Sequence, residues 1–182
     1  MMIEKRTTKD LLAESLKELC EIKSADKITI RELTQNCGLT APTFYNNFRD
    51  KYELMAWIYD CEVEKTIAQL GKNFSFEEVV YLWIKILLED EKFYRNLLKN
   101  AVGQNSFRYA TNDYAINLMQ AWLQERHEVS DDVNNCLRFY MRAISETIND
   151  WFLSRCEYSP RVLAKLLVEW MPAPLKPFLL QI

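Results

Sequence analysis

The sequence has few of the residues that interrupt helices or build metal sites. Its 182 residues include only 3 Gly and 5 Pro, and this scarcity predicts long elements and few turns, because chain breaks depend on these residue types. The single histidine is His127, and the 5 cysteines include no C-x-x-C pair, so the usual zinc-ligand spacings are missing. We expect no metal site and no cofactor.

Catalytic signatures and membrane spans are missing as well. The chain has no G-x-S-x-G, H-E-x-x-H or phosphate-loop glycine pattern, so we expect no catalytic residues. The longest apolar run, VVYLWIKILL, has ten residues and includes Lys85, which is too short to cross a bilayer. Glu4, Lys5 and Arg6 interrupt the first apolar residues, so we expect no signal peptide, a cytoplasmic location and no membrane association.

Positive charge is not in excess. The net charge is −3, which does not by itself indicate a nucleic-acid binder. Residues 1–52 carry 9 Lys and Arg against 8 Asp and Glu, whereas residues 53–182 carry 14 against 18. The N-terminal part is therefore slightly basic, which permits DNA binding there without requiring it.

Helical periodicity runs through the chain, and no segment alternates with the period of two that strands show. Several helix starts are marked by capping residues, such as Thr29 with Glu32 and Ser75 with Glu78 three positions later, and Thr40 and Ser159 ahead of a proline. We expect about nine helices, over residues 7–22, 29–38, 40–48, 50–70, 75–88, 89–103, 105–126, 130–156 and 159–171, followed by an irregular tail. The predicted fold is all-α, with a three-helix helix-turn-helix domain over residues 1–52 and a helical bundle over residues 53–182.

The segment GLTAPTFYNNFRDK, residues 38–51, concentrates three large aromatic side chains in a short polar stretch. A helix of two turns has little surface of its own, so we expect Phe44 and Phe48 to anchor it on the preceding helix. The polar residues between these anchors then face outward. A helix presented in this way fits the major groove of DNA, as the second helix of a helix-turn-helix does.

The longer segment ITIRELTQNCGLTAPTFYNNFRDKYEL, residues 28–54, resembles the DNA-binding signature of the tetracycline-repressor (TetR) family. The similarity rests on a Thr-x-Tyr-x-x-Phe-x-x-Lys spacing that runs from Thr43 to Lys51. The family usually carries His where Asn47 stands, which predicts a weaker phosphate contact there. FYRNLLKNAVGQNSFRY and MRAISETINDWF are similar to the C-terminal domain of Firmicutes-type members, which include regulators of dihydroxyacetone kinase operons.

The resemblance implies a role for each residue of the signature. The expected DNA interface comprises Thr29, Arg31, Thr40, Ala41, Pro42, Thr43, Tyr45, Asn46, Asn47 and Lys51. Phosphate contacts are expected from Thr29, Thr43, Tyr45 and Lys51, and contacts to base edges or sugar from Arg31, Thr40, Ala41, Pro42 and Asn46. The alternatives are an ion pair of Arg31 with Glu32 or Asp50, a merely exposed Tyr45 and a solvated Lys51.

The resemblance also implies an effector pocket and a dimer interface in the C-terminal part. Aromatic residues proposed for the pocket are Trp83, Phe93, Phe107, Trp122 and Tyr140, although most aromatics there are expected to form core or interface. The last two helices carry apolar stripes expected at a homodimer interface, formed by Leu137, Met141, Ile144, Ile148, Trp151, Phe152, Leu163, Leu166, Leu167 and Trp170.

The favoured function is a sequence-specific transcriptional regulator that binds a palindromic double-stranded DNA operator as a homodimer. An unknown small-molecule effector or protein co-regulator would control it from the C-terminal domain. Repression is the family default, and activation with a co-regulator is the alternative, since some regulators of the similar kind answer to a protein. A second class is a protein-interaction adapter with weakened DNA binding, and a third is a small helical enzyme, which the single histidine disfavours.

Overall fold

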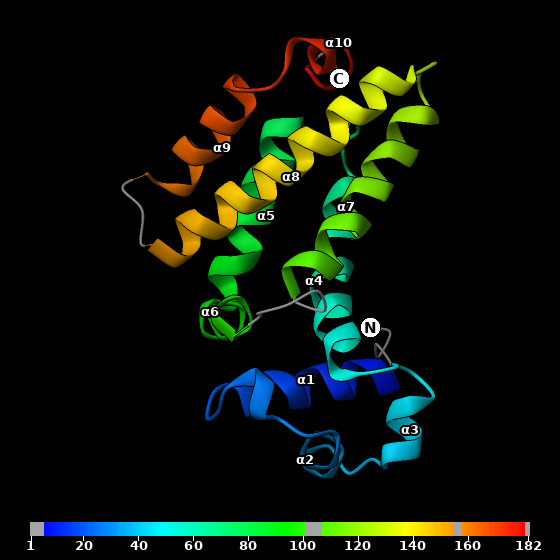
Figure 1. Ribbon diagram of the computed structural model, residues 1–182, viewed down its shortest axis with the longest axis vertical. Helices are drawn as coiled ribbons and strands as arrows, with labels where there is room; N and C mark the ends of the chain where they lie inside the picture. Colours follow the sequence, from blue (N-terminus) through cyan, green and yellow to red (C-terminus); the bar gives the residue numbers. More distant parts are fainter. Residues whose placement is uncertain (1–5, 101–106, 155–157, 181–182) are drawn as a thin grey trace. The chain divides into compact units, whose positions relative to one another are not determined.

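The structure, a computed structural model, describes residues 6–100, 107–154 and 158–180 (Figure 1). Its elements are α1 (Thr8–Cys20), η1 (Ala25–Lys27), α2 (Ile30–Asn36), α3 (Ala41–Tyr45), α4 (Lys51–Ile67), α5 (Phe76–Glu89), α6 (Glu91–Asn100), α7 (Phe107–Gln124), α8 (Asp131–Ser154), α9 (Pro160–Glu169), η2 (Ala173–Leu175) and α10 (Lys176–Leu179), where η denotes a 3-10 turn. The described residues form no strand, and the all-α prediction is confirmed. The predicted ends of the sixth and eighth helices and the start of the seventh lie outside the described residues.

The predicted capping residues are found at the starts of the helices. Thr29 and Ser75 each accept a hydrogen bond from the backbone N–H three residues later, and the carboxylate at that position accepts one from the backbone N–H of the cap residue. Thr40 caps α3 and Ser159 caps α9, each with a proline in the first turn. In the described part of the chain, no helix is both long enough and apolar enough to cross a membrane.

The chain divides into two compact units. Unit 1 comprises Met1–Ile58 and Lys92–Ala110, and unit 2 comprises Tyr59–Glu91 and Thr111–Ile182. The described residues 92–100 and 107–110 therefore pack with the N-terminal helices, although they follow a long stretch of unit 2 in the sequence. The functional boundary expected between residues 52 and 53 stays a prediction.

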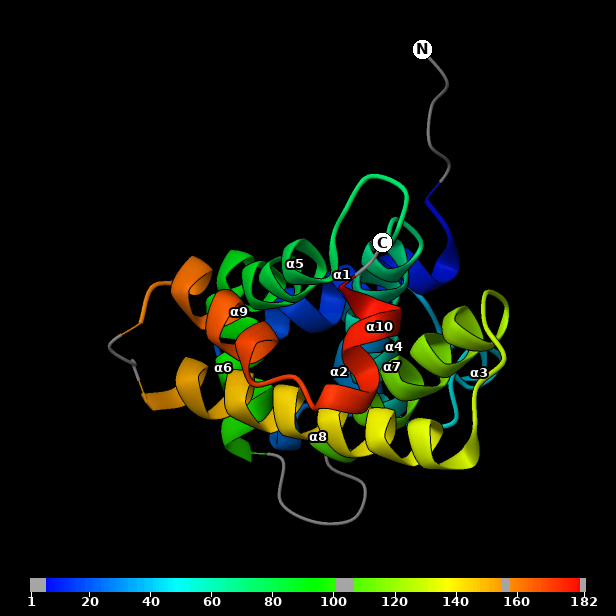
Figure 2. The same cartoon turned by 90° about the horizontal axis from the view of Figure 1, so that it is seen from above.

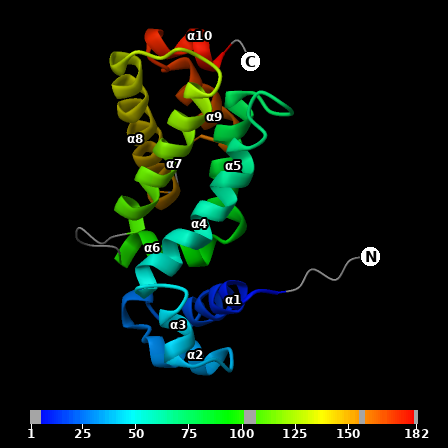
Figure 3. The same cartoon turned by 90° about the vertical axis from the view of Figure 1, so that its right-hand side faces the viewer.

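In unit 1, α1 packs on α2 and α2 packs on α3 (Figure 3). Leu16, Leu33 and Phe44 are fully buried in this core. The turn between α2 and α3 is made by Gly38, whose φ of 70° is costly for residues with a Cβ. This short connection fixes α3 against α2 as in a helix-turn-helix.

In unit 2, α5 lies against α9, and η2 packs on α8 (Figures 1 and 2). The Tyr140 hydroxyl on α8 donates to the Leu167 carbonyl on α9 at 2.6 Å. The expectation of an irregular tail is wrong, because η2 and α10 form there. Leu175 and Leu179 are buried in the core. This burial stabilises helical turns in a segment whose three prolines had led us to expect irregular structure.

Candidate nucleic-acid interface and effector cavity

Helix α3 is held at its start by side-chain hydrogen bonds. The Thr40 hydroxyl accepts from the Thr43 backbone N–H at 3.3 Å and lies 2.9 Å from the Thr43 hydroxyl. The Asn47 amide donates to the Thr43 carbonyl at 2.8 Å and so closes the other end of the helix. These polar side chains stabilise a five-residue helix that is too short to persist alone.

Aromatic side chains anchor α3 on its inner side. Phe44 and Phe48 are 0% and 3% exposed, whereas Tyr45 between them is 59% exposed. The centroid of the Phe44 ring lies 5.9 Å from that of Phe48 and 5.5 Å from that of Tyr45. The Phe44 and Tyr45 rings are nearly perpendicular. Phe48 also contacts Trp57, and the Lys9 ammonium lies 5.2 Å from the Phe48 ring centroid. The predicted anchoring roles of Phe44 and Phe48 are confirmed.

The outer side of α2 and α3 carries the side chains with the greatest freedom to contact DNA. Exposed members of the predicted interface are Thr29, Arg31, Thr40, Ala41, Pro42, Tyr45 and Asn46. Arg31 forms no ion pair with any residue in the described ranges. Its two predicted competitors are engaged elsewhere, because Glu32 pairs with Lys23 at 2.7 Å and Asp50 with Arg49 at 3.5 Å.

The start of α2 is closed by its own capping box. The Thr29 hydroxyl donates to the Glu32 carboxylate at 2.8 Å, and the Thr29 N–H donates to the same carboxylate oxygen at 2.9 Å. The Lys23 ammonium donates to the other oxygen at 2.7 Å. The bond from Lys23, followed by the two from Thr29, lowers the pKa of Glu32 to about 2. A phosphate at Thr29 therefore has to approach beside an ionised carboxylate.

The Lys51 side chain is hydrogen-bonded to the protein backbone. Its ammonium donates to the carbonyls of Ala25 at 2.9 Å, Asp26 at 2.5 Å and Ile28 at 2.9 Å. Burial lowers the pKa of Lys51, although the nearby Asp26 charge opposes that effect. A phosphate contact, as the resemblance implies, would require the ammonium to leave these three acceptors.

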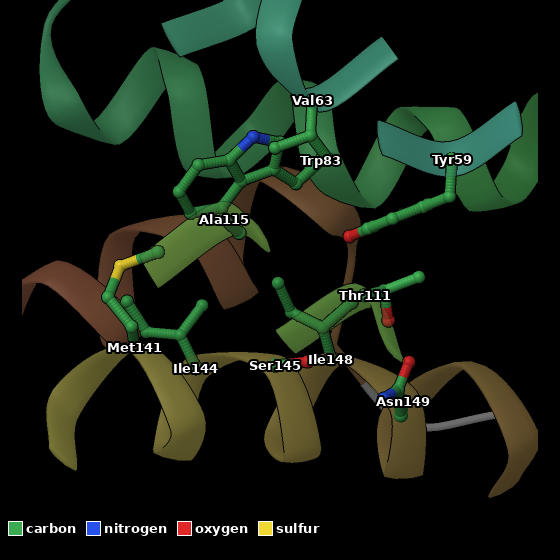
Figure 4. A pocket seen from close by; sticks show the side chains of 10 residues that line it. All are labelled: Tyr59, Val63, Trp83, Thr111, Ala115, Met141, Ile144, Ser145, Ile148 and Asn149. Carbon is green, nitrogen blue, oxygen red and sulfur yellow. The ribbon is translucent and has the colours of Figure 1, made fainter. Parts of the chain in front are cut away.

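Unit 2 contains a small cavity between α4, α5, α7 and α8 (Figure 4). It is lined by Tyr59, Val63, Trp83, Thr111, Ala115, Met141, Ile144, Ser145, Ile148 and Asn149. The Tyr59 hydroxyl points toward the space from one side, and Ile148 and Asn149 approach from the other (Figure 4). The free volume of about 20 Å³ holds roughly one water molecule. A larger ligand needs the lining side chains to move.

Most of the predicted pocket aromatics have structural partners instead. Trp83 lines the cavity, and its indole N–H donates to the Thr66 hydroxyl at 2.7 Å. Phe93 and Phe107 belong to unit 1, whereas Trp122 and Tyr140 donate to backbone carbonyls inside unit 2. Aromatic content indicates burial and cannot distinguish a cavity wall from the packed core.

The predicted dimer stripe is placed largely inside unit 2. Its buried members are Leu137, Met141, Ile144, Ile148, Trp151, Phe152, Leu163 and Leu167. These residues form monomer core, and Met141, Ile144 and Ile148 also line the cavity. Leu166 is partly exposed and Trp170 is 59% exposed, so these two keep accessible surface for a partner. The stripe indicated an apolar face correctly, but that face packs within the chain.

The polar side chains at and beside the cavity were not predicted from the sequence. Asn149 is buried within the apolar stripe of α8, and a lone amide in such a stripe is the signal that could have revealed it. Asp60 on α4 has a buried carboxylate oxygen that finds no hydrogen-bond partner among the residues that the structure describes. Burial, followed by the charge of Glu64, raises the pKa of Asp60 to about 7. Tyr114 donates to Glu64 at 3.0 Å.

The second half of the chain matches a known family. Residues 75–172 match the model for the C-terminal region of transcriptional regulators of the TetR type. A curated relative, the HTH-type dhaKLM operon transcriptional activator DhaS of Lactococcus lactis subsp. lactis strain IL1403, is 23% identical over 90 residues. That alignment covers 50% of this chain and 48% of DhaS, so the chain spans about half the length of this relative.

Solved structures share the fold over nearly the whole chain. The dihydroxyacetone kinase operon activator DhaS superposes with a TM-score of 0.64 and 21% identity, covering 94% of this chain and 97% of that one. A TetR transcriptional regulator from Rhodococcus sp. RHA1 gives 0.59 and 16% identity, covering 89% and 96%. The members of this family are transcriptional regulators and not enzymes. The family model spans more than half of the sequence, and the chain therefore belongs to the TetR-type transcriptional regulators.

Proposed function

We propose that this regulator binds a palindromic operator as a homodimer and changes its affinity when an effector or partner acts on unit 2. The observation that carries the proposal is the geometry of α3. Its inner side is anchored by buried Phe44, and its outer side presents Tyr45 and Asn46 to solvent. A short helix fixed in this way can enter the major groove with its side chains already positioned. We propose that it acts in the cytoplasm, as the compartment that holds its DNA target.

The proposed contacts follow from exposure and chemistry. Arg31 is exposed, and its guanidinium suits a bidentate contact to a guanine edge. Asn46 suits an adenine edge, and Tyr45 suits a phosphate oxygen. Thr40, Ala41 and Pro42 lie at the exposed start of α3, within reach of bases or sugar when the helix enters the groove. Thr43 and Asn47 are half-buried and bonded within α3, so their contribution is to hold the helix.

We propose that the dimer forms through the outward side of α8 and α9. Phe139 on α8 is 70% exposed, and Val162 and Trp170 on α9 are 45% and 59% exposed. Phe139 lines a surface hollow together with Arg138 and Arg142. Large apolar side chains ringed by charged ones are typical of protein interfaces. Two copies related by a twofold axis would bury them and present two α3 helices to a palindrome.

The cavity of unit 2 is the proposed effector site. Its walls are apolar apart from hydroxyls and one amide, at Tyr59, Thr111, Ser145 and Asn149. None of the described residues that line it is charged, so a neutral, mainly apolar ligand with one or two hydrogen-bonding groups fits best. Entry of such a ligand would displace side chains of α4 and α8. A protein co-regulator acting on unit 2 is the second candidate, because the similar DhaS is described as an activator.

The sign of regulation has two candidates. Repression is the common outcome for a TetR-type regulator that occupies an operator. Activation is favoured by the similarity to DhaS, which is described as the activator of the dhaKLM operon. Measuring transcription of a reporter placed behind the selected operator, with and without the protein, separates the two directly.

Operator binding tests the proposal. A duplex selected by the wild-type protein from a random pool serves as the probe, and affinity is measured by fluorescence anisotropy. Arg31→Ala should weaken binding by roughly 1–3 kcal/mol and relax the preference at one base position. Tyr45→Ala should cost roughly 1.5–3 kcal/mol at every sequence. Tyr158→Ala is the matched control, since Tyr158 is an exposed tyrosine of unit 2.

Two results would count against the proposal. If the pool yields no preferred sequence, the protein-interaction adapter becomes the better interpretation of this fold. If the Tyr45 and Tyr158 variants lose affinity equally, the contact surface does not lie on α3.

A further inference from the structure

Two side chains from distant parts of the sequence form hydrogen bonds to the backbone of one turn of unit 1, and we call this pair of contacts the grip. The turn comprises residues 21–28, between the end of α1 and the cap of α2. On one side lies Asn96 of α6, and on the other lies Lys51 at the start of α4. All of these residues belong to unit 1.

Asn96 uses both the NH₂ group and the oxygen of its side-chain amide in this grip. Its NH₂ donates to the carbonyls of Cys20 at 2.9 Å and Lys23 at 2.8 Å. Its oxygen accepts from the Ala25 N–H at 2.9 Å. Two donors and one acceptor in this order match an amide and no carboxylate. The Cys20 carbonyl lies in the last turn of α1, where helices leave carbonyls without internal partners, and Lys23 follows just beyond the helix end.

Lys51 completes the grip from the opposite side. Its three hydrogen bonds end on the carbonyls of Ala25, Asp26 and Ile28. Ala25 and Ile28 are 3% and 1% exposed, so water cannot readily replace a lost donor there. Asn96 and Lys51 therefore meet at one residue, since Ala25 gives its N–H to the first and its carbonyl to the second.

The gripped turn leads directly into the start of α2. Ile28, held by Lys51, immediately precedes Thr29, the N-cap of α2. Lys23, whose carbonyl is held by Asn96, extends its ammonium to Glu32 in the capping box. Both connections end at the capping box that orients α2, and α2 carries α3 through the Gly38 turn.

We propose that Asn96 and Lys51 are positioning residues that jointly fix the start of α2 for DNA binding, and that Lys51 does this in place of a phosphate contact. Neither side chain touches DNA in this arrangement. Lys51 opens α4, whose later residues belong to unit 2, and Asn96 lies on α6, which follows α5 of unit 2 in the chain. The inference rests on the proposed DNA-binding function and adds the residues through which α4 and α6 act on it.

The first test needs no DNA. Thermal unfolding of the full-length protein is compared for the wild type, Lys51→Met, Asn96→Ala, Asn96→Asp and the Lys51→Met/Asn96→Ala double variant. Both single variants should lower the melting temperature, and the double variant should lower it by less than the sum, because either loss already releases the turn. Asn96→Asp should melt no higher than Asn96→Ala, since it turns an acceptor toward two carbonyls.

Lys92→Ala is the matched control for the melting experiment. Lys92 also lies on α6 and reaches the same turn, through an exposed ion pair to Glu21 of 2.7 Å. An exposed pair contributes little, so this variant should melt close to the wild type. Additive losses at Lys51 and Asn96, or an Asn96→Asp variant as stable as the wild type, would overturn the joint grip.

The second test separates positioning from phosphate contact. Affinity for the selected duplex is measured at several salt concentrations, at a temperature where circular dichroism shows every variant folded. Asn96→Ala should bind the selected duplex at least tenfold more weakly, by roughly the factor that 1.4 kcal/mol represents, and should lose preference over a scrambled duplex. Lys51→Met should weaken binding while the slope of log affinity against log salt concentration stays unchanged.

The slope of log affinity against log salt concentration shows whether Lys51 is a positioning residue or a phosphate contact. A lysine that contacts phosphate reduces the slope by about 1 when it is removed. A drop of that size per chain for Lys51→Met, with an unchanged melting temperature, would overturn the proposal for Lys51. Wild-type affinity of folded Asn96→Ala would overturn it for Asn96. If the wild type itself prefers no duplex, the proposed function fails, whereas the grip is still decided by the melting data.

Discussion

Single residues of this regulator separate into those that anchor a surface and those that form it, and neighbours in the sequence take opposite roles. Phe44 is fully buried, and Tyr45 beside it is 59% exposed. Thr43 bonds within α3, whereas Asn46 faces solvent. This alternation explains why three aromatic side chains lie in so short a segment, since two of them hold the helix and the third lies on its outer side.

The Phe44 and Tyr45 pair yields a direct contrast. Phe44→Ala should lower the free energy of unfolding by about 3–5 kcal/mol, because it removes a fully buried ring from the core of unit 1. Tyr45→Ala should change it by no more than about 0.5 kcal/mol. Urea denaturation followed by circular dichroism measures both. Equal effects of the two substitutions would contradict the assigned orientation of α3.

Because of Asp60, we expect the free energy of unfolding to fall as pH rises. Its folded-state pKa of about 7 lies above the ordinary value of 3.8. The folded state therefore retains a proton that the unfolded state has lost, and stability declines between about pH 4 and pH 7. Asp60→Asn removes this titration. It should raise the melting temperature relative to the wild type by an amount that grows from pH 4 to pH 7 and is constant above.

The matched control for Asp60 is Glu128→Gln, an exposed acid of unit 2. Glu64 and Tyr114 lie beside Asp60 on α4 and α7 and stay unchanged in both variants. Melting temperatures of both variants and the wild type, measured from pH 4 to pH 8, test this prediction. A gain from Asp60→Asn that does not depend on pH would show that its carboxylate titrates normally.

At the scale of elements, helix starts could be predicted from local chemistry, and what each helix packs against could not. The capping boxes at Thr29 and Ser75 and the cap at Thr40 were predicted correctly, because each depends on residues three positions apart. α10 was missed because its stability comes from the buried Leu179, a tertiary effect. The stripe of α8 was assigned to a dimer because periodicity shows an apolar face without showing what covers it.

The capping box of α2 carries a prediction in acid. Glu32 has a folded-state pKa of about 2 against an ordinary 4.5. Its contribution to stability is therefore fully present above about pH 4.5 and is lost as pH falls toward 2. Glu32→Gln should be less stable than the wild type at pH 7, and the difference should disappear by about pH 2. A difference that persists at that pH, in urea titrations at each pH, would rule out the ionised cap.

At the scale of the whole chain, the two compact units do not follow the order of the sequence. The described residues 92–100 and 107–110 return to unit 1, where Asn96 binds the turn before α2. Such a return was beyond prediction, because it depends on hydrogen bonds between residues more than seventy positions apart. The cavity was also located only approximately, since Trp83 alone among the predicted aromatics lines it, and Thr111 and Ser145 had given no signal.

The assembly of two chains is predicted to depend on exposed apolar residues of unit 2. Phe139→Glu should weaken dimerisation at least tenfold, which corresponds to roughly 1.4 kcal/mol, because a charge would be buried in the interface. Ile22→Glu is the matched control, since Ile22 is 80% exposed in unit 1. Sedimentation equilibrium measures both. Unchanged association of the Phe139 variant would place the interface elsewhere.

Two chains are proposed to bind a palindrome through their α3 helices. The most direct measurement compares binding to the full selected duplex, to one half-site and to a scrambled duplex, by anisotropy over a range of salt concentrations. Two chains should bind each full duplex, and binding to the half-site should be much weaker. The logarithm of the affinity should fall linearly with the logarithm of the salt concentration. Equal affinity for the full and scrambled duplexes at every salt concentration would contradict this proposal.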